Sequence, residues 1–368
     1  MLKQRLNINR EKKDGNDYTY LNVNIMNSSL QGENFFASNP QIQFRDSLQY
    51  NIVDNPEDYL FSISRFSCEA GVLLPLWSPE IADGQPNPNL TSYSINLSVV
   101  VAGKTFSQTT PMIYSSESTA TPPSTPTLSR DSDHYYYVYT YSHIVYLFNQ
   151  MLTQCFTDLQ TQTATKFTAN CPFMTYEKTS GLFSLYFDNN GEQFTVNFDS
   201  NLYNMFYSFY FRNNNQLVID NAYGLNNVSI GSNTFTKVTQ DFVSTSMWSP
   251  IETLVFTTTS IPIVPEQNTQ PLYLPDGLNM TSATNSQVYQ KIITDIAIPV
   301  SQSSDYRSYI TYTPTFPRYI NLNSEVGLKD IDISLFFQDK YTGQLVPICL
   351  GNGGCVNMKL CFKRKNIL

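Results

Sequence analysis

Few residues of this 368-residue chain have the types and spacing that metal or nucleophilic chemistry requires. Its two histidines, His134 and His143, are nine residues apart, which fits neither a metal-binding motif nor a nucleophile–base arrangement. No phosphate-binding loop, dinucleotide glycine fingerprint or Gly-x-Ser-x-Gly elbow is present. We therefore expect no catalytic residue, no cofactor-binding residue, no metal ligand and no cofactor, and we do not expect an enzyme.

Cysteine is the next residue type with chemistry to offer. Cys349, Cys355 and Cys361 follow one another in six-residue steps, but the paired, closely spaced cysteines of a zinc site are missing. The N-terminus leads into polar residues and not into the apolar run of a secretion signal, which indicates maturation in a reducing compartment. We expect all six cysteines to be metal-free thiols: Cys68, Cys155, Cys171, Cys349, Cys355 and Cys361.

Carboxylates are numerous, and the sequence does not select a catalytic pair among them. Asp330 and Asp332 share one face of a predicted strand, which is an arrangement that a glycosidase could use. Nothing in the sequence favours this pair over any other. A hydrolase with paired carboxylates therefore stays open as a third interpretation, behind two non-enzymatic ones.

The elements that would position any site are mostly strands. The chain has 25 Tyr and 24 Phe with only 14% charged residues, a composition that suits half-buried pleated surfaces. Apolar residues alternate over 93–101, 331–337 and 356–362, the period of a strand with one buried face. The segments 331–337 and 356–362, together with the apolar run 345–350 between them, predict a three-stranded C-terminal meander. The preceding chain must supply an opposite sheet that covers the apolar face of this meander.

The middle of the chain differs in pattern. Residues 115–133 form a Ser/Thr/Pro tract that predicts an exposed loop or a boundary. Helical spacing follows from Ser142, the expected N-cap, to Leu159, and this is the one strong helix prediction. Asn189-Asn190-Gly191 lies between two strand candidates and predicts a hairpin.

The net charge of −8 conceals basic ends. Residues 1–13 and the last ten residues together hold nine of the 22 Lys and Arg. We interpret residues 1–17 as a mobile basic arm that contacts a polyanion, such as packaged DNA, or the acidic face of a neighbouring subunit. A solvated terminus is the plainer alternative. The aromatic residues fall at core-like spacing, so the interleaving with basic residues that is typical of single-strand binding is not expected.

Several short strings resemble the penton (vertex) capsid proteins of virophages and Polinton-like DNA viruses, and related minor capsid proteins of large DNA viruses. The strings are Asn55-Pro56-Glu57-Asp58-Tyr59, Trp248-Ser249-Pro250-Ile251, Ile261-Pro262-Ile263-Val264-Pro265-Glu266, Arg318-Tyr319-Ile320-Asn321-Leu322 and Lys359-Leu360-Cys361-Phe362-Lys363. The resemblance implies a jelly-roll fold, a homopentamer at icosahedral vertices beside the major capsid protein, location in the virion and no catalysis.

We therefore expect an all-β jelly roll, an antiparallel sandwich, built from 18–110 and 245–365. Residues 111–244 are expected to form an insertion that carries the one main helix, because a lone jelly roll does not need this length. Two non-enzymatic alternatives remain: a double jelly roll closer to a major capsid protein, and a carbohydrate-binding adhesin with a β-sandwich.

Overall fold

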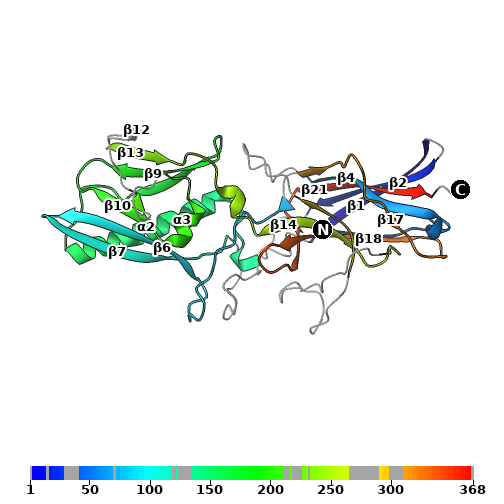
Figure 1. Ribbon diagram of the computed structural model, residues 1–368, viewed down its shortest axis with the longest axis horizontal. Coiled ribbons are helices and arrows are strands. Elements are labelled where there is room, and N and C mark those ends of the chain that lie inside the picture. The colour runs from blue at the N-terminus through cyan, green and yellow to red at the C-terminus, as the bar shows by residue number, and fades with distance from the viewer. Residues whose placement is uncertain are drawn as a thin grey trace. The chain divides into compact units, whose positions relative to one another are not determined.

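The chain forms two compact units (Figure 1). One, the jelly-roll unit, comprises Met1–Leu74, Pro250–Pro299 and Tyr306–Leu368, and the other, the inserted unit, comprises Pro75–Ser249 and Val300–Asp305. The computed structural model describes residues 2–13, 16–28, 41–68, 72–117, 122, 134–209, 216–217, 226–230, 233–264, 290–297 and 310–365.

Eight strands of the jelly-roll unit follow one another along the chain. They are β2 (Asn16–Asn27), β3 (Gln43–Ser47), β4 (Tyr59–Cys68), β14 (Ile251–Thr258), β15 (Lys291–Ala297), β16 (Ile310–Tyr312), β18 (Asp330–Asp339) and β21 (Cys355–Arg364). If these strands are numbered one to eight in chain order, one antiparallel sheet has the strand order 1-8-3-6 and the other has the order 2-7-4-5. Two sheets with this order form a jelly roll, so the predicted fold class is confirmed.

Both sheets bury one face in a shared core. On β2, the inward residues Leu21, Val23 and Ile25 are almost fully buried. Phe66 of β4 packs edge-to-face on Phe256 of β14, with ring centroids 5.0 Å apart, and so joins the two sheets. The alternation read from the sequence thus marks the core face, as hydrophobic burial requires.

The predicted C-terminal meander is wrong in its last strand. β19 (Leu345–Pro347) pairs with β18 as expected, whereas β21 pairs with β2 and β4 of the opposite sheet. Between them, β20 (Cys349–Leu350) pairs with β5 (Val72–Leu73), and the turn at 351–354 carries the chain across. The C-terminal strand β21 therefore belongs to the opposite sheet, the one that covers β18 and β19. The sequence pattern assigned that sheet to the preceding chain alone.

The predicted mobile arm is also wrong. β1 (Leu2–Lys13) pairs with β2 in unbroken register, from Leu2 opposite Asn27 to Lys13 opposite Asn16. Its inward positions include Leu6, which is half-buried, and Ile8, which is 45% exposed. This weak apolar pattern gave no strand signal, and the strand forms because it satisfies backbone groups along the edge of β2.

Deleting residues 2–13 should leave the eight-strand jelly roll folded. Since the inward apolar side chains of β1 stay partly exposed, we expect the free energy of unfolding to fall by only about 1–2 kcal/mol. Chemical denaturation monitored by circular dichroism measures this difference. Loss of cooperative unfolding in the truncated protein would show that β1 belongs to the essential core.

The main segment of the inserted unit, Pro75–Ser249, lies between the third and fourth jelly-roll strands in the sequence, and its boundaries differ from the expected 111–244. Its first sheet is β11-β10-β6-β7, and its second is β12-β13-β9-β8. The strand at 93–101, expected in the jelly roll, is part of β6 (Leu90–Val101) and pairs with β7 (Lys104–Ile113) and β10 (Phe194–Phe198). Its apolar face joins the core of the inserted unit. The alternation of apolar residues identifies the buried face of a strand, but it does not show which sheet the strand joins.

One long helix, α2 (Tyr141–Thr163), packs into this core between strands of both sheets (Figure 1). Its N-cap is Thr140 and not Ser142, because the Thr140 hydroxyl oxygen accepts a hydrogen bond from the His143 backbone N–H at 3.2 Å. The other strands and α-helix that the structure describes in this unit are β8 (Phe173–Glu177), β9 (Leu182–Asp188), α3 (Ser200–Met205), β11 (Gln216–Leu217), β12 (Asn226–Ile230) and β13 (Asn233–Thr239).

The predicted hairpin at Asn189-Asn190-Gly191 does not form. β9 pairs with β8 and β13, whereas β10 pairs with β6 and β11, so the turn connects two different sheets. Gly191 has φ +104°, and a Cβ there would lie 2.1 Å from Thr168 Oγ1 and 2.8 Å from the backbone nitrogen of Ala169. Both the positive φ and the close approach demand glycine.

Gly191→Ala should therefore destabilise the inserted unit by about 2–4 kcal/mol. Gly103→Ala is the matched control, since Gly103 also has a positive φ (+77°) but no atom within 4 Å of the added Cβ. The control should cost about 1 kcal/mol. Equal melting temperatures for the two variants would contradict the close approach at Gly191.

Candidate functional surface

One sheet face of the jelly-roll unit has an unusual chemistry. Because Leu21, Val23 and Ile25 of β2 point into the core, the residues between them point outward, and antiparallel cross-strand partners share a face. We call this the outer face. Its register positions are Lys3, Arg5, Asn7, Asn9 and Glu11 on β1, Tyr18, Tyr20, Asn22, Asn24 and Met26 on β2, Cys355, Asn357, Lys359, Cys361 and Lys363 on β21, and Leu60, Ser62, Arg65 and Ser67 on β4.

Tyrosine rings and lysine ammonium groups alternate on the outer face. Tyr18 and Tyr20 are nearly parallel, with ring centroids 5.9 Å apart. Lys359 Nζ lies 4.0 Å from the centroid of Tyr20, and Lys363 Nζ lies between Tyr18 and Tyr319, at 5.9 and 5.6 Å. Each cation–π contact of this kind contributes about 0.5–1 kcal/mol. Basic and aromatic residues therefore do interleave on this face, but as ring–cation pairs and not as the base-stacking surface that is typical of single-strand binding.

Burial among these tyrosine and lysine side chains raises the pKa values of Tyr319 and Cys361. Desolvation, together with proximity to Cys361, raises the pKa of the Tyr319 hydroxyl to about 12. Desolvation also raises the pKa of the Cys361 thiol, whose side chain is 1% exposed. Both groups therefore stay neutral at physiological pH, and the charge of this layer is that of its lysines.

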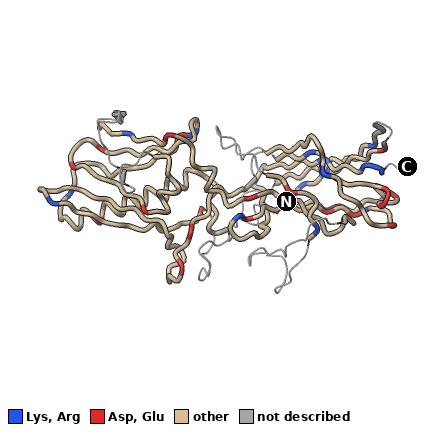
Figure 2. The backbone as a smooth tube through the Cα atoms, in the orientation of Figure 1, with Lys and Arg blue, Asp and Glu red and all other residues tan. Residues whose placement is uncertain are grey.

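Positive charge on the outer face has little local compensation. Lys3, Arg5, Arg65, Lys359 and Lys363 form no ion pair with a carboxylate in the described part of the chain. In Figure 2, Lys and Arg are visible along the strand that runs to the C-terminus. Glu11 is the only acidic residue at a register position of this face in the described strands.

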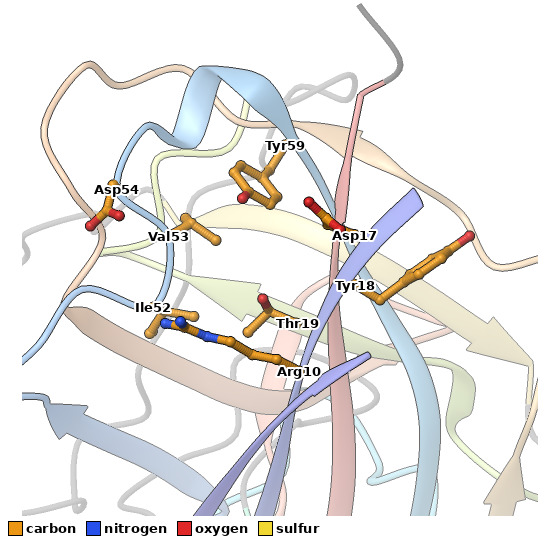
Figure 3. A pocket seen from close by; sticks show the side chains of 8 residues that line it. All are labelled: Arg10, Asp17, Tyr18, Thr19, Ile52, Val53, Asp54 and Tyr59. Carbon is orange, nitrogen blue, oxygen red and sulfur yellow. The ribbon is translucent and has the colours of Figure 1, made fainter. Parts of the chain in front are cut away.

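A pocket of about 410 Å³ lies at one end of the same sheet (Figure 3). Its lining consists of Arg10, Asp17, Tyr18, Thr19, Ile52, Val53, Asp54 and Tyr59. Asp17 Oδ2 lies 3.6 Å from Arg364 Nη1, and Asp54 Oδ1 accepts a hydrogen bond from Asn51 Nδ2 at 3.0 Å. Both carboxylates thus have local partners, and the pocket presents a mixed polar surface without an evident acid–base pair.

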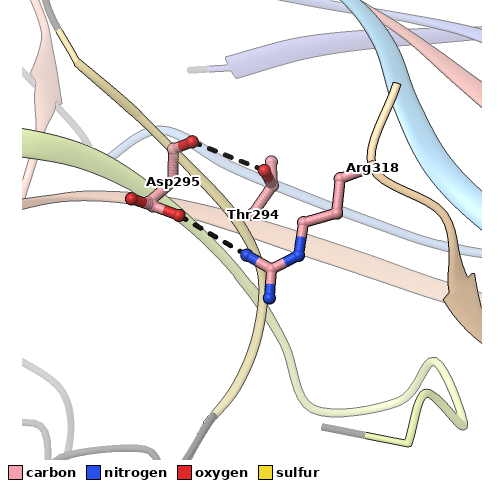
Figure 4. Close-up of polar contacts among 3 residues, drawn as sticks. All are labelled: Thr294, Asp295 and Arg318. Atoms are coloured by element: carbon pink, nitrogen blue, oxygen red, sulfur yellow. Dashed lines mark hydrogen bonds and ion pairs between the residues drawn. The ribbon is translucent and has the colours of Figure 1, made fainter. Parts of the chain in front are cut away.

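An ion pair tethers the edge strand β15 to the segment before β17 (Ile320–Asn321). Arg318 Nη1 lies 3.6 Å from Asp295 Oδ1, and Thr294 Oγ1 donates to the backbone oxygen of Asp295 at 3.4 Å (Figure 4). The two charged side chains are 34% and 47% exposed, so the pair contributes at most about 1 kcal/mol. Its role is structural.

The two histidines lie in different elements. His134 begins the 3-10 turn η2 (His134–Tyr136), and His143 lies in the first turn of α2. His143 Nε2 is 2.6 Å from the backbone oxygen of Ser115, and its ring stacks on Tyr146 with centroids 5.7 Å apart. These contacts fix a helix start and do not orient a nucleophile.

The predicted carboxylate pair separates into two unlike residues. Asp330 is exposed, whereas Asp332 is 3% exposed and accepts hydrogen bonds from Thr258, Thr259 and Ser260 at the end of β14. The desolvation of Asp332 is outweighed by these donors, which lower its pKa to about 2. A carboxylate held ionised by five donors is a structural anchor and a poor proton donor.

The cysteines are spread over both units. Cys349 lies in β20, and Cys355 and Cys361 lie on β21, so the six-residue steps cross two sheets. The described residues contain no group of three or more His, Cys, Asp or Glu that could hold a metal. Burial raises the pKa of the Cys68, Cys171 and Cys349 thiols to about 12.

The thiols of Cys68, Cys171 and Cys349 should react slowly in the native protein. At pH 8 a thiol with pKa 12 is almost wholly protonated, and the thiolate is the reactive form. Alkylation followed by peptide mass spectrometry should label them far more slowly than in the unfolded chain. Native labelling at the unfolded rate would contradict their burial.

Among the described helices, none combines the length and apolar character needed to cross a membrane. The described residues thus contain a jelly roll, an inserted unit and a basic, aromatic sheet face. Jelly rolls of this kind occur in viral capsid proteins, lectin domains and cupins, so the fold alone does not choose among these classes.

Comparisons with known proteins identify the family. The family model described as "Sputnik minor capsid protein V18/19" matches residues 19–364, and the chain belongs to this family. It is thus a structural capsid protein, located in the virion.

Solved structures share the fold. A chain in the cryo-EM structure of the Sputnik virophage is 21% identical, with a TM-score of 0.71, and the alignment covers 95% of this chain and 99% of that one. The crystal structure of the mavirus penton protein is 15% identical, with a TM-score of 0.58 and coverage of 94% and 98%. No curated protein sequence matches significantly.

Proposed function

We propose that the chain is the penton of a virophage-like icosahedral capsid and forms homopentamers at the vertices. The observation that carries the proposal is the shared architecture of both units: the match to the mavirus penton protein extends over 94% of this chain and therefore includes the insertion. A head-to-tail interface that closes after five copies makes such a ring. In this role the ring contacts the neighbouring major capsid protein.

The proposal includes the absence of catalysis. Its support is that His143, Asp332 and the pocket carboxylates Asp17 and Asp54 each have structural partners. In a double jelly roll, the inserted unit would repeat the strand orders 1-8-3-6 and 2-7-4-5. The two described sheets of the inserted unit have other strand orders. This favours the vertex over the major capsid position.

Cryo-EM of purified particles tests the proposal. We expect a ring of five copies at each fivefold vertex into which the jelly-roll unit fits, and vertices without this ring in particles assembled without the protein. Density for the chain in the capsomers that tile the faces would favour a major capsid role. Particles that lack the chain altogether would overturn the proposal.

A further inference from the structure

The outer face places like charges next to each other. Arg65 on β4 and Lys359 on β21 are direct cross-strand partners, an arrangement that disfavours the fold unless an anion relieves it. Neither forms an ion pair within the described chain, and Arg65 is exposed. The position therefore attracts an external negative charge.

Two asparagines, Asn7 and Asn22, continue the Lys359–Arg65 pair into a row of side chains across four strands. Asn7, Asn22, Lys359 and Arg65 are successive register partners on β1, β2, β21 and β4. Four strands span about 14 Å, and the four residue steps from Lys359 to Lys363 span about 13 Å. A DNA duplex carries one charge per about 1.7 Å of its axis, so a face of this size meets several phosphates.

The tyrosines organise the lysines. The ring of Tyr20 is covered by the ammonium of Lys359 at 4.0 Å, so this ring face holds a cation and is not free to stack on a base. Lys363 is held in the same way by Tyr18 and Tyr319. The lysines are thereby positioned at fixed sites, which suits contacts with a backbone and not the reading of a sequence.

The composition of the face favours a nucleic acid over a protein partner. Cores of protein interfaces are apolar and depleted in lysine, whereas interfaces with DNA are more polar and strongly positive. Here Asn, Lys, Arg and Tyr prevail, and apolar positions are few: Leu60, Met26 and the two buried cysteines Cys355 and Cys361.

We propose that the outer face of the β1-β2-β21-β4 sheet binds the phosphate backbone of nucleic acid without sequence preference. In a capsid this face would meet the packaged genome, and that placement rests on the proposed function, whereas the binding itself does not.

Fluorescence anisotropy with the purified full-length chain tests the proposal, with a labelled random-sequence DNA duplex and the matching single strand as probes. The face variant is Arg5→Gln/Arg65→Gln/Lys359→Gln. Its control, Lys104→Gln/Lys166→Gln/Lys178→Gln, changes net charge equally at three exposed lysines of the inserted unit. Circular dichroism verifies that each variant is folded.

Wild type and control should bind both probes, with an affinity that falls steeply with salt. In the face variant, the slope of log affinity against log salt for the duplex should decrease by about 3, or about 0.9 per lost contact. Asn22→Asp supplies a second variant that keeps every cation and adds a carboxylate beside Lys359. It should weaken binding by about fivefold or more through charge repulsion.

Equal affinities and equal slopes for the face variant and the control would overturn the proposal, as would a wild-type chain that binds neither probe. Unchanged DNA affinity combined with loss of self-association only in the face variant would assign the face to a protein interface and also overturn it. Vertex occupancy in particles is measured separately, so failure of this proposal is distinguishable from failure of the vertex role.

Discussion

Replacing Asp332 by Asn should destabilise the jelly-roll unit by about 3–5 kcal/mol. The carboxylate accepts from the backbone N–H groups of Thr259 and Ser260 at 2.8 and 2.7 Å and from the hydroxyls of Thr258, Thr259 and Ser260. An amide keeps the shape but removes the charge and points an NH₂ group at donors. Buried backbone donors would then lose their acceptor.

The exposed Asp330 on the same strand provides the control, since Asp330→Asn should change stability by less than about 0.5 kcal/mol. Urea denaturation of both variants measures the difference. If Asp332→Asn unfolds at the same urea concentration as Asp330→Asn, the carboxylate does not anchor the end of β14.

Acid should reproduce part of this effect in the wild-type protein. The pKa of Asp332 is lowered from 3.8 to about 2 on folding, so the stabilisation is fully present above pH 4 and is lost as the pH falls towards 2. A shift of this size corresponds to about 2–3 kcal/mol. The stability difference between wild type and Asp332→Asn should therefore narrow between pH 4 and pH 2. A difference that is independent of pH over this window would contradict the lowered pKa.

Leu335→Asp should prevent folding of the jelly-roll unit. Leu335 is 1% exposed in the middle of β18, opposite Phe256 of β14. An unpaired buried carboxylate there costs about 5 kcal/mol or more, which is comparable with the whole stability of a domain. The variant should accumulate as insoluble protein and give no cooperative unfolding transition.

Val326→Asp is the matched control, because Val326 is 78% exposed in the loop before β18. It should be as soluble and as stable as the wild type. A soluble, normally assembled Leu335→Asp protein would show that this residue does not face the core.

Apolar alternation predicted the strands of a sandwich because it reports the buried face of a strand, as at Leu21, Val23 and Ile25, whereas the jelly-roll class came from the family resemblance. On β18 both faces are buried, because Ser334 and Phe336 are as inaccessible as Ile333 and Leu335. The sequence could not predict that β21 crosses to the opposite sheet, since alternation is silent about pairing partners. The same limitation assigned residues 93–101 to the jelly roll and not to the insertion. β1 was missed because it is an edge strand whose side chains stay largely exposed.

The outer face was beyond prediction for a related reason. Tyr18 and Tyr20 lie near the start of the chain, and Lys359 and Lys363 lie near its end. Their interleaving exists only through the pairing of β2 with β21. The one usable signal was the concentration of basic residues at both termini, which indicated a shared partner without showing that the termini lie in one sheet.

Native mass spectrometry of the purified protein tests the vertex role most directly. The account predicts a dominant species of five times the 41.9 kDa of one chain, stable at moderate salt. A dominant trimer would contradict it in favour of a major capsid protein. A monomer at concentrations where assembly proceeds would contradict a preformed pentameric vertex.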